Sequence, residues 1–334
     1  MVEFTVFKGS ESGAIVKSST TREIKPDEVL IKITHSGLCG TDEHYRNQDM
    51  GLGHEGAGVV EEIGSAVKEL AKGDSVGWGY IHNSCKNCKQ CATGHEMLCA
   101  QRELYGYHNR DQGSFGTYGV WKEDFVFKIP SSIPREYAAP LMCGGATVFS
   151  ALNNHGAKAT DRVGVIGVGG LGHLAIQFAA KMGCEVVVFS GSDNKKEEAL
   201  ALGASEFYAT RGQDGKPADL KIGRGIDHLL VTASFNPDWT QFLGVLAPGC
   251  TIYPLTVSEG NFEIPQMAMI ASELHIQGSM VAARQVHRNM LLFAAHHQIR
   301  PTIEQFPMSA EGITEAMQKL ADGKMRYRGV VVNQ

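Results

Sequence analysis

Four closely spaced cysteines are the clearest chemical signal in the chain. Their spacing is C-x2-C-x2-C-x7-C, at Cys85, Cys88, Cys91 and Cys99. A compact loop with this spacing can wrap one tetrahedral ion, and four thiolates leave no coordination position open for a substrate. Lysine, asparagine and glutamine interleave the cysteines, which favours an exposed loop over cysteines packed as small core residues. We therefore predict a structural zinc site, with an iron–sulfur cluster as the alternative.

A glycine-rich turn is the second signal. The apolar run at residues 162–166 is followed by a G-x-G-x-x-G pattern and then by a helical stretch through Met182. In a dinucleotide-binding unit the first glycine makes the turn, the second lets the backbone approach a pyrophosphate, and the third lets the helix pack on the strand. Residues 185–189 have the composition of the next parallel strand. The sequence predicts that the cofactor contacts the loop Gly167, Val168, Gly169, Gly170, Leu171 and Gly172.

The end of that next strand bears on the choice of cofactor. An NAD site of this type places an acidic residue about 20 residues after the glycines, where it binds the ribose 2′-hydroxyl. Gly191 occupies that position, and small hydroxyl residues there leave room for a 2′-phosphate. Lys195 and Lys196 supply nearby positive charge, whereas Asp193 would favour NAD. The balance predicts NADP, bound in part by Ser190, Gly191, Ser192 and Lys195.

A third set of residues could hold a catalytic metal. Such a zinc needs about three protein ligands and one position for water or substrate. Cys39, His54 and Cys143 would supply two thiolates and one imidazole. Spacing alone leaves this set ambiguous, because a lone cysteine is usually a core residue and a lone histidine is more often structural.

The elements that must position these residues divide the chain into two parts. Residues 1 to about 140 have the pattern of strands and turns, with strands expected at 28–33 and 56–64 and after the turn at 73–77. Helix and strand patterns then alternate, as a parallel sheet requires, with a last strand at 271–279. A helix at 311–321 and a strand at 329–332 follow. The sequence predicts a β-rich domain (1–145 and 286–334) and a nucleotide-binding domain (146–285).

Composition excludes several other classes of protein. The 334 residues are 43% hydrophobic and 20% charged, with a net charge of −5 and a pI of about 6.2. These values are typical of a soluble globular protein. They show none of the excess positive charge that is expected of a protein that binds nucleic acid. We expect no membrane partner, since no apolar run is long enough to span a bilayer. The N-terminus lacks the pattern of a signal peptide, so we expect a cytoplasmic protein. In such a compartment the cysteines are expected to bind metal ions or take part in catalysis rather than to form disulfides.

The order of the motifs resembles that of the zinc-containing medium-chain alcohol dehydrogenases. The resemblance rests on residues 39–42 (CGTD), 53–56 (GHEG), the four-cysteine loop, 143–147 (CGGAT) and 167–172. Residues 112–116 and 325–332 are most similar to the cinnamyl alcohol dehydrogenase branch. The resemblance implies an α/β fold, with a Rossmann-type doubly wound parallel sheet domain and a β-rich GroES-like catalytic domain.

The resemblance also implies roles for single residues. Cys39, His54 and Cys143 become catalytic zinc ligands, with Glu55 as an alternate ligand or charge modulator. Thr41 would pass the alcohol proton outward to His44, although a surface histidine often has no role, and Asp42 would orient the segment. Further cofactor contacts are expected at Thr147, Thr232, Ser279 and Arg326.

The expected function follows from these roles. We expect a homodimeric, zinc-dependent alcohol dehydrogenase or aldehyde reductase with two zinc ions per chain and NADP(H), acting on apolar primary alcohols and aldehydes, aromatic ones included. The segment 45–53 is shorter than in most relatives, which predicts an altered wall of the substrate site. Alternatives are a polyol or secondary-alcohol dehydrogenase, a reductase of C=C or C=N bonds, and a zinc-ribbon module that binds nucleic acid.

Overall fold

The computed structural model of the chain describes residues 1–257 and 260–333. It divides into two compact units. Unit 1 comprises Met1–Ala146 and Val281–Gln334, and unit 2 comprises Thr147–Met280.

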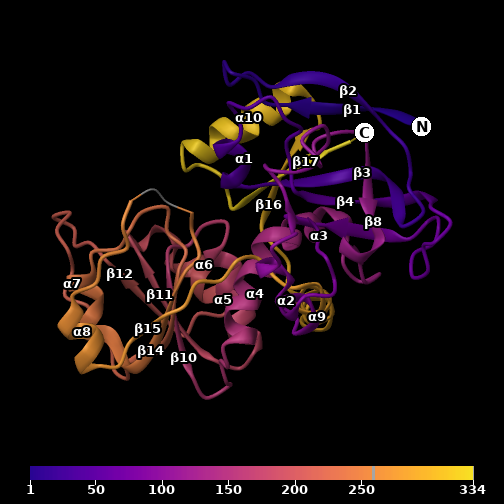
Figure 1. Cartoon of the computed structure of the whole chain (residues 1–334). Helices are drawn as coiled ribbons and strands as arrows, with labels where there is room; N and C mark the ends of the chain where they lie inside the picture. Colours follow the sequence, from indigo (N-terminus) through magenta and orange to yellow (C-terminus); the bar gives the residue numbers. More distant parts are fainter. Residues whose placement is uncertain (258–259, 334) are drawn as a thin grey trace. The chain divides into compact units, whose positions relative to one another are not determined.

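Unit 1 is built on a seven-stranded sheet with the order β16-β17-β3-β4-β5-β9, in which β8 also pairs with β3. Figure 1 shows β3, β4 and β8 side by side in this sheet. Two small sheets, β1-β2 and β6-β7, complete the strands. The bounds are β1 Val2–Lys8, β2 Val16–Arg22, β3 Glu28–Leu38, β4 Glu55–Ile63, β5 Ser75–Trp78, β6 Ile81–Asn83, β7 Glu103–Leu104, β8 Tyr118–Lys122, β9 Val126–Lys128, β16 Ile303–Pro307 and β17 Arg328–Val332.

The helices of unit 1 are mostly short and join these strands. They are α1 Gly40–His44, α2 Lys89–Ala92, α3 Arg135–Pro140, α9 Arg284–His297 and α10 Ala310–Ala321, with single turns η1 Glu96–Leu98, η2 Glu123–Phe125 and η3 Leu141–Gly145. Alternate residues of β3, Val29, Ile31 and Ile33, are buried against Trp78 and Trp121. This inward alternation is what fixes the register of a sheet with one covered face.

Unit 2 is a six-stranded parallel sheet with the order β12-β11-β10-β13-β14-β15. Its strands are β10 Arg162–Ile166, β11 Glu185–Ser190, β12 Glu206–Ala209, β13 Ile226–Val231, β14 Leu246–Pro254 and β15 His275–Ile276. Its helices are α4 Ala146–Asn154, α5 Gly172–Lys181, α6 Lys196–Ala201, α7 Trp239–Phe242 and α8 Gln266–Ala271, with turns η4 Asp193–Lys195 and η5 Leu243–Val245. In Figure 1, α4 and α5 lie to one side of this sheet, and α7 and α8 to the other.

The strand order explains where unit 2 can bind a ligand. Residues 186–189 of β11 are all fully buried, as expected for a parallel strand covered on both faces. The chain order reverses between β10 and β13, and ligands bind such sheets outside the carboxyl ends of the strands at this switch point. The predicted doubly wound sheet is confirmed, and the glycine loop follows β10 directly.

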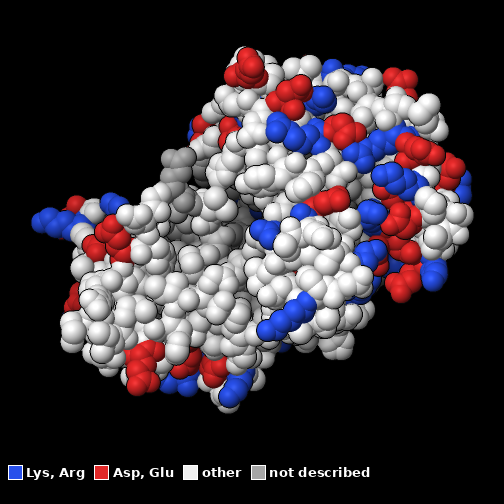
Figure 2. Space-filling view, viewed as in Figure 1, with Lys and Arg blue, Asp and Glu red and all other residues white. Residues whose placement is uncertain are grey.

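Two predicted strands differ in length from the observed ones. β3 continues past Ile33 to Leu38, because its polar second half pairs with β4 and β17. The last strand of the parallel sheet is only His275–Ile276, since α8 occupies residues up to Ala271 and only two residues pair with β14. Across the described residues, we find no helix with the length and hydropathy needed to cross a bilayer. Acidic and basic side chains are interspersed on the face of unit 1 drawn in Figure 2.

Candidate metal and cofactor sites

The first metal-binding group lies in unit 1, where three separate segments meet. Cys39 directly precedes α1, His54 directly precedes β4, and Cys143 lies on the turn η3. Glu55 opens β4 and pairs in register with Gly37 near the end of β3. One donor atom from each of Cys39, His54, Glu55 and Cys143 lies within 4.8 Å of the others. The fold thus gathers four donors from distant parts of the sequence.

Asp42 organises this group from within α1. Its Oδ2 accepts a hydrogen bond from the Cys39 backbone N–H at 2.9 Å, and its Oδ1 accepts bonds from His54 Nδ1 and the Tyr105 hydroxyl, each at 2.9 Å. Because Nδ1 donates to the carboxylate, Nε2 carries the free lone pair of His54. Nε2 is buried, faces the Cys39 thiol and makes no hydrogen bond of normal geometry with any described residue. A zinc ion fits this donor set, since it would accept that lone pair and both thiolates.

The two thiols of the group are coupled. A hydrogen bond from Cys143 holds the pKa of Cys39 well below its usual value, and His54 and Arg328 add to this effect. The same hydrogen bond, together with burial, holds the pKa of Cys143 well above its usual value. A bound cation would displace the shared proton, so metal affinity at this group should fall as the pH is lowered.

Glu55 is held beside the metal-binding group by a buried ion pair. Both of its carboxylate oxygens accept hydrogen bonds from Arg328 of β17, and both residues are buried. Burial raises the pKa of Glu55 to about 7, although Arg328 opposes the rise. Gly37 makes room for the carboxylate, because a Cβ at this position would lie 1.9 Å from Glu55 Oε2.

Thr41 and His44 lie on α1 next to the same group. The Thr41 hydroxyl is 3.7 Å from the Cys39 sulfur and is partly buried, whereas His44 ends the helix and is exposed. One short helix therefore carries a hydroxyl beside the metal donors and an imidazole in solvent. Such an order of groups can pass a proton from the site to water.

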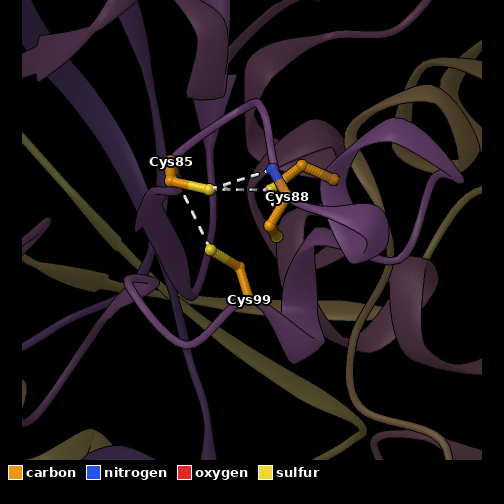
Figure 3. A group of neighbouring side chains, drawn as sticks. Cys85, Cys88 and Cys99 are labelled. Carbon is orange, nitrogen blue, oxygen red and sulfur yellow. Dashed lines mark hydrogen bonds between the residues drawn. The ribbon is translucent and has the colours of Figure 1, made fainter.

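The four-cysteine loop forms a second, closed group in unit 1 (Figure 3). Its four sulfurs lie within 4.8 Å of one another, with Cys91 at 3.6 Å from Cys88 and 3.9 Å from Cys85. These separations match a tetrahedral Zn–S₄ site, whose sulfurs are about 3.8 Å apart for Zn–S bonds of about 2.3 Å. Backbone N–H groups of Asn87 and Cys88 lower the pKa of Cys85 to about 6, while burial raises that of Cys91 to about 11. Zinc fits this group as well.

The glycine loop of unit 2 has the geometry that dinucleotide binding requires. Gly167 follows β10 with a φ of +93°, a conformation that favours glycine. A Cβ at Gly172, the first residue of α5, would lie 1.9 Å from the Gly167 carbonyl oxygen, so only glycine permits this close packing. A Cβ at Gly169 would meet nothing within 4 Å, which leaves the backbone open to a ligand. The Thr232 hydroxyl donates to the Ile166 carbonyl at 2.9 Å and braces the turn. Val168, Gly170 and Leu171 complete the loop before α5.

The end of β11 lies close to this loop. Ser190 ends the strand, and Gly191 and Ser192 are exposed after it. Lys195 ends the turn η4, and its Nζ donates to the Val168 carbonyl at 2.7 Å. The ammonium of Lys195 therefore contacts the glycine loop from the turn that follows the end of β11. Asp193 opens the same turn and is exposed.

The remaining predicted cofactor residues are spread over both units. Thr147 is buried in α4 and Ser279 follows β15, both in unit 2. Arg326 belongs to unit 1, where its backbone N–H donates to Glu304 at 2.6 Å and its guanidinium lies over the Tyr327 ring.

Sequence patterns missed several residues that shape these sites. Tyr105 donates to Asp42, the partner of His54, and Arg328 pairs with Glu55; both contacts join residues far apart in the sequence, which no local pattern reveals. In unit 2, a cavity of about 180 Å³ opens at the carboxyl ends of β13 and β14, lined in part by Ala233, Phe235 and Thr256. The residues that line this cavity could have been found from the rule that ligands bind at the carboxyl ends of parallel strands.

Comparisons with known proteins show the family to which the chain belongs. Residues 25–131 match the alcohol dehydrogenase GroES-like domain, and residues 170–296 match the zinc-binding dehydrogenase family. NADP-dependent alcohol dehydrogenase C 1 of Mycolicibacterium smegmatis is 36% identical over 93% of this chain and 92% of its own length. Cinnamyl alcohol dehydrogenase 7 of Arabidopsis thaliana is 34% identical over 96% of this chain and 93% of its own.

Solved structures extend the likeness over the whole chain. The cinnamyl alcohol dehydrogenase SbCAD4 from Sorghum bicolor matches with a TM-score of 0.90 at 31% identity, covering 99% of this chain and 98% of its own. The Helicobacter pylori CAD complexed with NADP(H) matches with a TM-score of 0.86 at 28% identity, with the same coverage. The chain therefore belongs to the zinc-binding medium-chain alcohol dehydrogenases, oxidoreductases that act on CH–OH groups with NAD(P).

Proposed function

We propose that the enzyme prefers NADP(H) and acts in cells mainly as an aldehyde reductase on apolar primary aldehydes and alcohols, aromatic ones included. In this proposal unit 1 is the catalytic domain and unit 2 binds the cofactor. The observation that carries the cofactor preference is Lys195, whose ammonium contacts the glycine loop from the turn that follows the exposed Gly191. The names of the mycobacterial and Arabidopsis relatives support the cofactor and the substrate class. The eight free thiols suit a reducing compartment, and we assign the enzyme to the cytoplasm.

The two metal-binding groups receive different roles. Cys39, His54 and Cys143 hold the catalytic zinc, Glu55 serves as alternate ligand or charge modulator, and the four-cysteine loop holds a structural zinc. Bound zinc supplies a Lewis acid that polarises the carbonyl, and bound nicotinamide supplies the hydride. Asp42 orients His54 and Cys39, while Thr41 and His44 carry the proton between the substrate oxygen and water.

Replacing Thr41 with alanine tests the proton path. We expect turnover to fall by about 10²-fold or more, because general acid–base groups typically contribute 10²–10⁴-fold. The dissociation constant for the cofactor should change much less than turnover, since Thr41 is not among the predicted cofactor contacts. His44→Ala should cost less, because water can replace an exposed relay group. A Thr41→Ala enzyme with nearly full turnover would remove Thr41 from the path.

Replacing Gly191 with aspartate tests the cofactor preference. The wild-type enzyme should have a higher kcat/KM with NADPH than with NADH, and Gly191→Asp should reduce or reverse this ratio. An acidic side chain there repels the 2′-phosphate and accepts a hydrogen bond from the 2′-hydroxyl of NADH. The added Cβ meets nothing within 4 Å, so the substitution should be tolerated by the fold.

Matched variants separate position from charge in this test. Gly223→Asp adds the same charge at another exposed glycine of unit 2 whose Cβ also meets nothing within 4 Å, and it should leave the ratio unchanged. Lys195→Ala should weaken NADPH binding and spare NADH. A wild-type enzyme that prefers NADH would defeat the assignment to NADP.

The homodimer is proposed to form through the nucleotide domain. The edge strand β15 is exposed, and three apolar side chains nearby face solvent: Met267 (70% exposed), Ile270 (61%) and Ile276 (45%). An exposed edge strand with apolar neighbours is a usual site for pairing of chains. Sedimentation equilibrium should give twice the chain mass for the wild type and a lower mass for Ile270→Lys. A monomeric wild type would refute the proposal.

A further inference from the structure

Helix α9 begins on a carboxylate supplied by the four-cysteine loop. Its N-cap residue, Ala283, has no side-chain acceptor, and its first turn contains no acidic residue. Glu96, which lies between Cys91 and Cys99, accepts hydrogen bonds from the Arg284 backbone N–H at 2.7 Å and from Arg284 Nε at 3.0 Å. Glu96 is only 2% exposed. A carboxylate at this position satisfies a free N–H group and stabilises the positive end of the helix dipole.

The same loop reaches Arg284 by a second route. Asp124 forms ion pairs with Lys86 of the loop and, at 3.4 Å, with Arg284. The guanidinium of Arg284 also lies 5.2 Å from the centre of the Phe125 ring. The beginning and the end of the cysteine loop are therefore both tied to the first residue of α9.

One turn further along, α9 reaches the segment that carries a catalytic metal donor. His287 is 2% exposed and stacks on Phe127 of β9, with ring centres 4.1 Å apart. A Cβ built at Gly79 would lie 3.6 Å from the His287 ring and 2.4 Å from the carbonyl oxygen of Met142, the residue before Cys143. α9 also packs directly against η3, the turn that contains Cys143.

From these contacts we propose that Glu96 is a positioning residue, which couples the four-cysteine loop to the Cys143 side of the catalytic metal site through α9. The coupling rests on the proposed roles of the two metal-binding groups. When the loop is ordered, Glu96 caps α9 and holds this helix against η3, the turn that carries Cys143. Without the carboxylate, Arg284 loses its buried partner and the start of α9 loses its cap, so the Cys143 donor is held less firmly.

Cobalt-substituted enzyme provides the test, because its absorption reports on metal geometry without turnover. The d–d and thiolate-to-cobalt bands of the catalytic site are obtained by subtracting the spectrum of Cys143→Ala, which retains only the four-cysteine site. We expect Glu96→Ala to shift these bands and to lower kcat roughly tenfold, the lower end of the effect of losing an outer-shell partner. KM for the cofactor should stay constant. Glu96→Gln keeps one hydrogen-bond acceptor, so its cobalt bands and its kcat should both lie close to those of the wild type.

Glu69→Ala is the matched control. Glu69 pairs with Arg288 of the same helix at 3.8 Å but is exposed, so its loss should leave the cobalt bands and kcat unchanged. If Glu96→Ala does not fold, the comparison passes to Glu96→Gln and Arg284→Ala, which should shift the same bands to a smaller extent. Folded Glu96 and Arg284 variants with wild-type cobalt bands would overturn the coupling. A wild-type enzyme without catalytic-site cobalt bands would instead refute the proposed ligand set.

Discussion

Replacing Cys143 with alanine is expected to abolish turnover and leave a folded chain with one zinc. The thiol is one of three strong donors of the catalytic group, and a zinc site with two remaining protein ligands binds its metal poorly. Losing the Lewis acid removes several kcal/mol of transition-state stabilisation, which corresponds to a fall in kcat of about 10³-fold or more. The fold should persist, because the change removes one sulfur from the turn η3 and leaves the four-cysteine group intact.

Elemental analysis and steady-state kinetics on the same sample check this prediction. Cys184→Ala is the control, since Cys184 is also buried but lies in unit 2, outside both metal-binding groups. It should keep two zinc ions and full turnover. A Cys143→Ala enzyme with two zinc ions or with substantial turnover would show that Cys143 is not a catalytic ligand.

Replacing Cys91 with alanine is expected to act on stability first. Cys91 is buried in the four-cysteine group, within 4 Å of two other sulfurs. Structural zinc contributes folding free energy directly, with apparent binding energies of about 10–16 kcal/mol in small zinc-binding peptides. Only part of this binding energy should appear as lost stability, because unit 1 has a hydrophobic core of its own and does not depend on zinc alone to fold. We expect the thermal midpoint to fall by at least about 5 °C, given about 2–4 °C per kcal/mol for a unit of this size.

Calorimetry and limited proteolysis distinguish this effect from loss of activity. The loop between Cys85 and Cys99 should become the first site of cleavage, since it loses the ion that orders it. Cys184→Ala again serves as control, and its midpoint should fall by no more than about 2–4 °C, which corresponds to about 1 kcal/mol for a small buried truncation. A Cys91→Ala enzyme with an unchanged midpoint and two zinc ions would contradict the structural role.

Sequence patterns predicted the parts of the molecule that depend on near neighbours. The four-cysteine loop closes within a few residues, so its spacing indicates its chemistry; the glycine loop needed the strand and helix patterns on either side of it as well. The parallel sheet followed from alternating helix and strand patterns, and it excludes a small zinc-ribbon module for this chain. Cys39, His54 and Cys143 needed the family resemblance, because three distant segments bring them together.

The supporting contacts could not be predicted from the sequence, because they join residues far apart in it. Glu55 and Arg328 are separated by 273 positions, and Glu96 and Arg284 by 188. A local pattern cannot distinguish such a buried carboxylate from a solvated one. The length of β3 has the same origin, since its polar half is held by pairing with β17 from the end of the chain.

Transfer of deuterium from cofactor to substrate tests the central claim most directly. NADPH deuterated at both C4 positions is incubated with an aromatic and an aliphatic aldehyde, and the alcohol products are analysed by mass spectrometry. We expect wild-type enzyme to form alcohols that carry one deuterium on the carbinol carbon, and Cys143→Ala to form none. Alcohol without deuterium, or labelled alcohol formed equally well by Cys143→Ala, would contradict hydride transfer at the Cys39, His54 and Cys143 site.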